Sequence, residues 1–214
     1  MKTERIGSQP LILEPKRIKV SSINILQYGP KTVYIKDGQL HREDGPAIEY
    51  ANGDKHWWMN GKRHREDGPA VESKDEYKEW YQNGELHRLD GPAIEGNGYK
   101  FWYKNGQQYR EDGPAVEWDN GDKEWYQNGK RHREDGPAVE SSNGYNRWYK
   151  DGQPHRVVGP AVESKDGYKE WYINGKLHRE DGPAIEYING YKKWFINGEE
   201  LTEEEFKKYL NNKK

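Results

Sequence analysis

The chain has 214 residues, and its 35 basic and 37 acidic residues leave a formal net charge of −2. This balance predicts no general electrostatic attraction to nucleic acid or to an anionic membrane surface. The sequence contains no cysteine, which excludes disulfides, thiolate metal sites and cysteine nucleophiles. Hydrophobic residues make up only 31% of the chain, but nine Trp and sixteen Tyr indicate a thin, aromatic-rich core rather than a disordered chain.

Residues 1–30 are predicted to form an N-terminal cap, because the apolar residues between Leu11 and Ile35 are typical of irregular strands. No apolar run follows the N-terminus that is long enough for a signal peptide. No stretch approaches the roughly 18 apolar residues of a membrane span. We therefore expect a cytoplasmic protein.

Two markers repeat along the next 170 or so residues, and their period dominates the sequence. The tripeptide Gly-Pro-Ala begins at Gly45, Gly68, Gly91, Gly113, Gly136, Gly159 and Gly182. An aromatic residue keeps the same period at Tyr34, Trp57, Trp80, Trp102, Trp125, Trp148, Trp171 and Trp194. A fixed period of 23 residues, with one step of 22, predicts a repeat domain over residues 31–201 with about eight hairpin units.

Residues 77–98 illustrate one unit. The aromatic, alternating stretch 77–82 predicts a strand, and Asn83-Gly84 predicts a tight hairpin turn. Residues 93–95 predict a second, short strand, and residues 96–98 predict the turn to the next unit. The single residue missing from the 22-residue step falls in this turn, where a deletion leaves the faces of the strands unchanged.

Alternation along the aromatic strand places its two aromatic columns on opposite faces of the sheet. One column contains the Trp residues. The other consists of Trp58, Tyr81, Tyr103, Tyr126, Tyr149, Tyr172 and Phe195. The sequence leaves open which column is buried.

Residues 202–214 are predicted to form a C-terminal helical cap. Thr202 and the acidic residues after it form a capping-box pattern, and Phe206, Tyr209 and Leu210 form an apolar stripe. A short helix is expected over residues 203–211. The predicted fold is therefore all-β: an elongated single-layer antiparallel sheet of stacked hairpin repeats with a short capping helix.

Segments such as residues 80–84, 125–130 and 171–176, with an aromatic residue followed by Asn-Gly, resemble MORN repeats. The resemblance covers roughly residues 31–200, and His-Arg-x-Asp-Gly-Pro-Ala replaces the glycine-rich half of the usual repeat. This variant is similar to MORN-like repeat proteins of large bacteriophages, giant viruses and bacterial antitoxin-like proteins. The resemblance implies a sheet used for binding, with no catalytic residue to carry over.

Six histidines recur at His41, His64, His87, His132, His155 and His178, and Tyr109 takes the seventh place. Equivalent residues on successive units are expected about 9–10 Å apart, too far to share an ion whose bonds are about 2 Å long. We expect a structural role and no metal or cofactor.

An arginine follows each of these positions, at Arg42, Arg65, Arg88, Arg110, Arg133, Arg156 and Arg179. All but Arg156 stand two residues before an Asp, which predicts a local Arg–Asp pair. Val157 and Val158 replace the acidic residues after Arg156, so Arg156 is the best candidate for a specialised contact, although drift is an equally good explanation.

The repeat gives no unique catalytic constellation, so we expect no enzyme. The sequence favours a non-enzymatic protein that binds a host or cognate protein. The resemblance suggests a phage-encoded inhibitor of a defence or toxin protein in the host cytoplasm. The candidate partner-binding residues are Tyr81, Tyr103, Tyr126, Tyr149, Tyr172 and Arg156. The alternative is a small nucleotide or other ligand, including one in a Trp cage, held between repeats; no nucleic-acid polymer and no membrane are expected.

Overall fold

The structure is a computed structural model that describes residues 16–20 and 23–213. The predicted cap residue Leu11 lies outside the described residues. The chain divides into two compact units, residues 1–84 and 85–214. Both units are built from short antiparallel strands, and a single helix follows the last strand. The prediction of an all-β fold with a short C-terminal helix is confirmed.

The strands of the first unit are β1 (Lys16–Val20), β2 (Ile23–Tyr28), β3 (Lys31–Lys36), β4 (Gln39–Leu40), β5 (Ile48–Tyr50), β6 (Lys55–His56), β7 (Trp58–Met59), β8 (Lys62–Arg63), β9 (Val71–Glu72), β10 (Lys78–Glu79) and β11 (Tyr81–Gln82). Strand β2 pairs with β1 and β3, and β3 pairs with β5. The sheet continues in antiparallel steps through β6, β9 and β10. Strands β2 and β3 are longer than the strands of the repeats that follow them.

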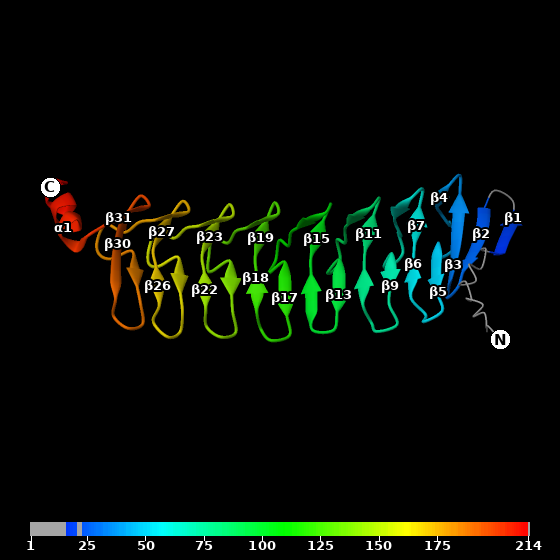
Figure 1. Cartoon of the computed structure of the whole chain (residues 1–214), viewed down its shortest axis with the longest axis horizontal. Helices are drawn as coiled ribbons and strands as arrows, with labels where there is room; N and C mark the ends of the chain where they lie inside the picture. The colour runs from blue at the N-terminus through cyan, green and yellow to red at the C-terminus, as the bar shows by residue number, and fades with distance from the viewer. Residues whose placement is uncertain (1–15, 21–22, 214) are drawn as a thin grey trace, which may run out of the picture. The chain divides into compact units, whose positions relative to one another are not determined.

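The strands of the second unit are β12 (Glu85–Leu86), β13 (Ile94–Gly96), β14 (Tyr99–Phe101), β15 (Tyr103–Lys104), β16 (Gln107–Gln108), β17 (Val116–Trp118), β18 (Lys123–Glu124), β19 (Tyr126–Gln127), β20 (Lys130–Arg131), β21 (Val139–Glu140), β22 (Asn146–Arg147), β23 (Tyr149–Lys150), β24 (Gln153–Pro154), β25 (Val162–Glu163), β26 (Lys169–Glu170), β27 (Tyr172–Ile173), β28 (Lys176–Leu177), β29 (Ile185–Glu186), β30 (Lys192–Ile196) and β31 (Glu199–Leu201). The main sheet runs β13-β14-β17-β18-β21-β22-β25-β26-β29-β30, each strand antiparallel to the next. Four small hairpins, β15–β16, β19–β20, β23–β24 and β27–β28, lie above it in Figure 1.

The aromatic strand is interrupted at its Trp in the six repeats from Trp57 to Trp171, whereas Trp194 lies within the continuous strand β30. The prediction of one continuous strand over residues 77–82 is therefore wrong. In that unit β10 ends at Glu79 and β11 begins at Tyr81. Trp125 shows the reason: its N–H donates to the Ala138 carbonyl at 2.8 Å, whereas its carbonyl accepts the N–H of His132 at 3.1 Å. The two backbone groups of one residue thus bind different segments, and the chain passes from the main sheet into the small hairpin at this point.

The tight turns of the small hairpins follow the sequence prediction. In the turn between β19 and β20, Asn128 has a φ of 51° and Gly129 a φ of 70°. Both values lie in the left-handed region that Asn and Gly tolerate best, and this geometry matches the twist of a two-residue hairpin. The sequence pair Asn-Gly, or Asp151-Gly152 between β23 and β24, therefore fixes the length and register of each small hairpin.

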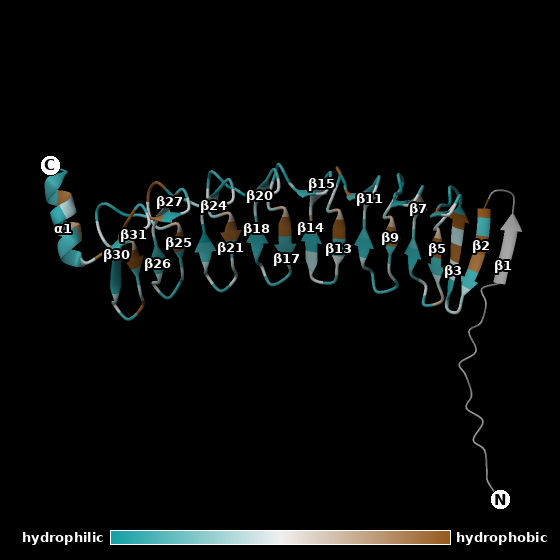
Figure 2. Cartoon of the chain, turned by 45° about the horizontal axis from the view of Figure 1, so that its top comes forward, coloured by the Kyte–Doolittle hydropathy of each residue, from teal (hydrophilic) through white to brown (hydrophobic). Residues whose placement is uncertain are grey.

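The deepest part of the core consists of alanine rather than of aromatic residues. The Gly-Pro-Ala alanines are 0% exposed in all seven units: Ala47, Ala70, Ala93, Ala115, Ala138, Ala161 and Ala184. The following Val or Ile is also buried or nearly so. In Figure 2 the apolar residues of β17 and β21 contrast with the hydrophilic strand β18 between them. The Trp and Tyr columns are both half-buried, so neither one alone forms the core.

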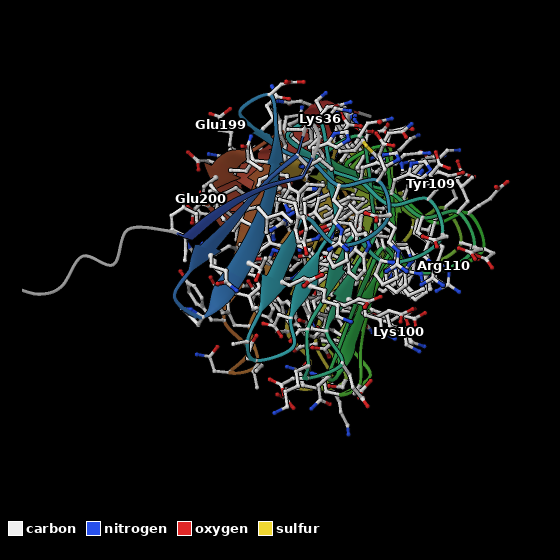
Figure 3. All side chains as sticks on the ribbon, turned by 90° about the vertical axis from the view of Figure 1, so that its right-hand side faces the viewer. Lys36, Lys100, Tyr109, Arg110, Glu199 and Glu200 are labelled. Atoms are coloured by element: carbon white, nitrogen blue, oxygen red, sulfur yellow. The ribbon has the colours of Figure 1, made fainter. Side chains whose placement is uncertain are left out.

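The opposite face of the main sheet carries alternating acidic and basic residues. In register, Lys100 pairs with Glu117, Glu117 with Lys123, and Lys123 with Glu140. Opposite charges at directly paired positions stabilise an antiparallel sheet modestly. Figure 3 shows Lys100 and Arg110 on the same side of the chain, so this charged face is also the face of the arginine column.

The helix α1 (Glu203–Asn212) begins with the predicted capping box. The Thr202 hydroxyl accepts the N–H of Glu205 at 3.2 Å, and the Glu205 carboxylate accepts the N–H of Thr202 at 2.8 Å. Phe206 is buried against β30 and β31. The predicted helix over residues 203–211 is confirmed, with one further residue at its end.

We expect Ala138→Leu to destabilise the protein by about 1–3 kcal/mol, because the added side chain has no space at a fully buried position. Ala51→Leu provides a matched control, since Ala51 is exposed; its effect should stay within about 0.5 kcal/mol. Urea unfolding of both variants measures the difference. Equal effects would contradict the assignment of the alanine column to the core.

Candidate functional site

The most regular surface of the protein is a row of loops with the sequence His-Arg-x-Asp-Gly-Pro or a close variant. We call these segments the Arg loops. They comprise residues 41–46, 64–69, 87–92, 109–114, 132–137, 155–160 and 178–183. Each Arg loop follows a small hairpin and leads into the buried alanine of its own repeat. The loops are therefore regularly spaced within each of the two compact units.

Arg133 shows how the side chains of one Arg loop are held. Its guanidinium carbon lies 3.9 Å from the centre of the Trp125 ring. Its Nε donates to Asp135 at 2.9 Å, and Nη1 donates to the Pro137 carbonyl at 3.2 Å and to Glu140 at 2.6 Å. A single guanidinium thus combines a cation–π contact, two charge-assisted hydrogen bonds and a bond to the backbone.

The bonds to Asp, to the Pro carbonyl and to Glu recur in six loops. The distance from Nε to the Asp oxygen is 2.7–3.0 Å at Arg42, Arg65, Arg88, Arg110, Arg133 and Arg179. Their side chains are 19–22% exposed. The hydrogen bond from Arg133 holds the pKa of Asp135 below its usual value, and the same cause acts on the Asp of the other five loops.

The glycine of Gly-Pro-Ala is required by the close approach of the arginine. A Cβ atom built on Gly136 would lie 2.9 Å from the guanidinium carbon of Arg133. The corresponding distances in the other five loops of this kind are 2.9–3.1 Å, and none of these six glycines has a positive φ. The guanidinium therefore lies close to a bare backbone as well as to an aromatic ring, and a larger residue at the glycine would require the arginine to shift.

The loop at residues 155–160 departs from this arrangement. Arg156 keeps its place 3.8 Å from the Trp148 ring and donates to the Pro160 carbonyl at 3.0 Å. Its bond to Glu163 is longer, at 3.5 Å. Val158 stands where the other six loops have Asp, and among the described residues Nε of Arg156 has no acceptor. The Arg156 side chain is accordingly more exposed, at 31%.

The backbone of this loop also differs. Gly159 has a φ of +97°, in the left-handed region, unlike the equivalent glycine in the other six loops. Val157 and Val158 are 79% and 82% exposed. Two aliphatic side chains beside a cation that lacks its carboxylate form the most unusual surface on the repeat.

Clefts lie between consecutive Arg loops. The cleft between the loops at 109–114 and 132–137 has a volume of about 660 Å³, and its lining includes Trp125 and Gln127. The cleft between the loops at 155–160 and 178–183 has a volume of about 380 Å³, and here Ile173 takes the place of Gln127. The second cleft is therefore smaller and more apolar.

The predicted partner-binding tyrosines lie in the first strand of each small hairpin and are half-buried. Their hydroxyls are involved in bonds within the protein: Tyr126 donates to Glu124 at 2.7 Å, and Tyr81 accepts from Arg63 at 3.1 Å. Burial, and then the bond to Glu124, raises the pKa of Tyr126 to about 12. Burial also raises the pKa of Tyr81, Tyr103 and Tyr172. The hydroxyls of Tyr81 and Tyr126 are thus already bonded within the protein. Tyr149 belongs to the same half-buried column.

The histidine column connects each unit to the next. The backbone N–H of Asn174, in the turn of the following hairpin, donates to Nδ1 of His155 at 3.0 Å. Equivalent bonds to His41, His64, His87, His132 and His178 measure 3.0–3.2 Å. At His64, His155 and His178 this contact makes Nδ1 an acceptor for the backbone. At His41, His87 and His132, Nδ1 also lies 2.8–3.1 Å from a side-chain oxygen of the same turn residue, so its role there depends on the tautomer. Among the described residues, no group of three or more His, Asp or Glu side chains could hold a metal ion.

Tyr109 replaces histidine at one joint, and that joint has fewer bonds. In the part of the chain that the structure describes, the N–H of Asn128 has no side-chain acceptor. The neighbouring bond from Gly129 N–H to the Gln108 carbonyl is 3.3 Å long, whereas the other joints have 2.8–2.9 Å. The joint around Tyr109 is therefore the weakest of the connections between consecutive units.

The sequence predicted the Arg–Asp pairs, and in the structure each of these arginines binds its Asp. The sequence also singled out Arg156, whose loop has Val158 in place of the Asp. It did not predict the Glu acceptor seven residues after each Arg, although Ala-(Val/Ile)-Glu recurs in every unit. It also missed Ile173, which is apolar where five other repeats carry Gln or Lys, although Met59 and Ile196 are apolar at the same position. The predicted tyrosines are spread one per repeat along the small hairpins, and one of them adjoins Arg156: the N–H of Arg156 donates to the Tyr172 carbonyl at 3.1 Å.

A comparison with models of known protein families finds no match, and a comparison with curated proteins finds no similar sequence. Among the described residues, no helix has both the length and the apolar character needed to cross a membrane.

We expect Gly136→Ala to destabilise the protein by about 1–3 kcal/mol, since its methyl group would collide with Arg133. The cost should fall below about 0.5 kcal/mol in an Arg133→Ala background, where the colliding group is gone. Chemical unfolding of the two single variants and the double variant gives this coupling. A cost that is unchanged in the double variant would show that the glycine is needed for another reason.

We expect Tyr109→His to stabilise the protein by about 0.5–1.5 kcal/mol, because it supplies the missing acceptor for the N–H of Asn128. The measurement is made at pH 8, since Nδ1 accepts only when the ring is neutral. Tyr109→Phe is the matched control and adds no acceptor. Hydrogen exchange at Asn128 should slow in the histidine variant alone, and an unchanged rate would contradict the proposed bond.

Proposed function

We propose that this is a non-enzymatic binding protein that recognises another protein through its Arg loops. The observation that carries the proposal is the departure at residues 155–160, where two exposed valines stand beside an arginine that lacks its Asp partner and keeps an ion pair with Glu163 at 3.5 Å. A large exposed apolar residue beside a charge is typical of protein interfaces rather than of an inert surface. Arg156 is therefore the first candidate contact, and the tyrosines of the small hairpins are the second.

A repeat surface suits extended contact with a macromolecule, because each unit adds a similar loop and cleft. In the regular units the charged groups of the Arg loops are already paired within the unit. These units support the surface without offering strong individual contacts. We propose that affinity comes from the irregular loop and its cleft, with the regular loops as flanking contacts.

The resemblance to MORN-like repeats suggests the kind of partner. It supports a phage-encoded inhibitor or modulator of a host defence or toxin protein, acting in the host cytoplasm. This part of the proposal depends on the resemblance alone.

A small nucleotide held between repeats has less support. Six of the seven guanidiniums already bind Asp and Glu carboxylates, and the cleft at residues 109–135 carries four carboxylates against two arginines. A phosphate would meet more repulsion than attraction there. The relevant test is a titration with oligonucleotides and cyclic dinucleotides followed by Trp fluorescence at two salt concentrations. We expect no binding of oligonucleotides at physiological salt.

We expect affinity capture with the immobilised protein to return one protein partner reproducibly, and the purified pair to form a stable complex. Hydrogen exchange of the purified pair should then show protection of amides in the Arg loops. Protection confined to the turns at the far edge of the main sheet would contradict the proposed surface. Failure to reconstitute a complex with any captured protein, together with tight nucleotide binding, would contradict protein binding itself.

A further inference from the structure

We infer that the cleft beside Arg156 is a recognition site for an acidic side chain, Asp or Glu, with an aliphatic or aromatic neighbour, on a partner protein. The inference deepens the proposed function and rests on it. The site comprises Arg156, Val157, Val158, Gly159 and Ile173, with the second loop of the cleft at 178–183 on its other side.

The protein itself shows how a carboxylate binds this guanidinium. In six sister loops an Asp oxygen lies 2.7–3.0 Å from Nε, while the ring contact and the bond to the Pro carbonyl hold the guanidinium in place. Arg156 keeps that ring contact and that carbonyl bond. Its guanidinium is thus held at the same two points as in the loops that bind a carboxylate, but Val158 cannot supply the oxygen.

The charge of the cleft agrees with an acidic ligand. The loops on either side of it contribute Arg156 and Arg179 against Glu180 and Asp181. The loops around the cleft at residues 42–67 contribute two arginines against four carboxylates. Glu180 is in addition paired with Lys213 of the C-terminal segment. The site beside Arg156 is therefore less repulsive to an incoming carboxylate than the clefts between complete loops.

The apolar neighbours determine what accompanies the carboxylate. Val157 and Val158 are the most exposed apolar side chains of the described chain, and Ile173 lines the same cleft. Burying two valines against a partner side chain is favourable by the hydrophobic effect, while a charged group next to them is not. An acidic residue adjacent to an aliphatic or aromatic one satisfies both halves of the site. A nucleotide phosphate lacks the apolar half, and a second copy of this chain is a further outcome that the experiment distinguishes.

The test uses the full chain and a library of random twelve-residue peptides. Peptides that bind the Val158→Asp variant are first removed from the library, and the remaining peptides are then selected for binding to the wild-type protein. Val158→Asp places a carboxylate at the position used by the six sister loops, so it should fill the site from within. Val158→Asn is the matched control, because it removes the valine without adding a charge. Arg156→Ala removes the donor.

We expect the selected peptides to share an Asp or Glu next to an aliphatic or aromatic residue. Their affinity for Val158→Asp and for Arg156→Ala should fall at least tenfold, and Val158→Asn should keep more affinity than Val158→Asp. Without any ligand, Val158→Asp should also unfold at a higher urea concentration than Val158→Asn, since it restores the internal pair. Selected peptides without acidic residues, or equal affinities of the Asp and Asn variants, would overturn the inference.

The two proposals fail differently. A captured protein partner whose affinity is unchanged in Arg156→Ala and Val158→Asp would leave the proposed function intact and overturn this site. Analytical ultracentrifugation could show concentration-dependent self-association that Val158→Asp abolishes and Val158→Asn does not. This result would assign the acidic ligand to a second copy of the chain. It would overturn the inference that the ligand at this cleft belongs to a separate partner protein.

Discussion

The guanidinium held between an aromatic ring and a glycine is the interaction on which the repeat depends. It explains why four separate positions keep their identity from unit to unit. Arg133 needs the flat ring of Trp125 on one side and the bare backbone of Gly136 on the other. Its three donor contacts then fix Asp135 and Glu140. A change at any one position leaves the other groups with unfilled contacts, so the positions are constrained together.

This interaction compensates for a small core. The buried residues of each unit are mainly one alanine and one Val or Ile, which bury little area. The half-buried Trp125 ring adds a contact with the guanidinium of Arg133 at 3.9 Å. Both stay partly open to water, so the stability of each unit is spread over many modest contacts rather than over a few large buried side chains. Such a unit depends on its neighbours, which is the general behaviour of repeat proteins.

The sequence was sufficient for the period, the tight turns and the C-terminal helix, because these depend on local rules. Asn128-Gly129 needs only its own backbone preferences, and Thr202 with Glu205 needs only helix geometry. The break of the strand at Trp125 could not be predicted in this way. It arises because the N–H and the carbonyl of Trp125 bind two different segments of the chain. The local pattern of alternation does not show to which segment each group binds. The role of Gly136 was hidden for a similar reason: the contact is with a side chain, while its φ is ordinary.

Two departures from the repeat have different physical consequences, and the comparison shows where a function can be placed. At Tyr109 the lost group is an acceptor between two units, so the effect is a weaker joint within the protein. At Val158 the lost group is a carboxylate on the surface, so the effect is a donor of Arg156 that faces solvent and remains oriented. In a chain whose regular charges are paired within each unit, an oriented and unpaired donor beside exposed valines is the group best able to distinguish one partner from another. Specificity can therefore come from the Arg loop that lacks its Asp, while the other loops provide a more uniform support.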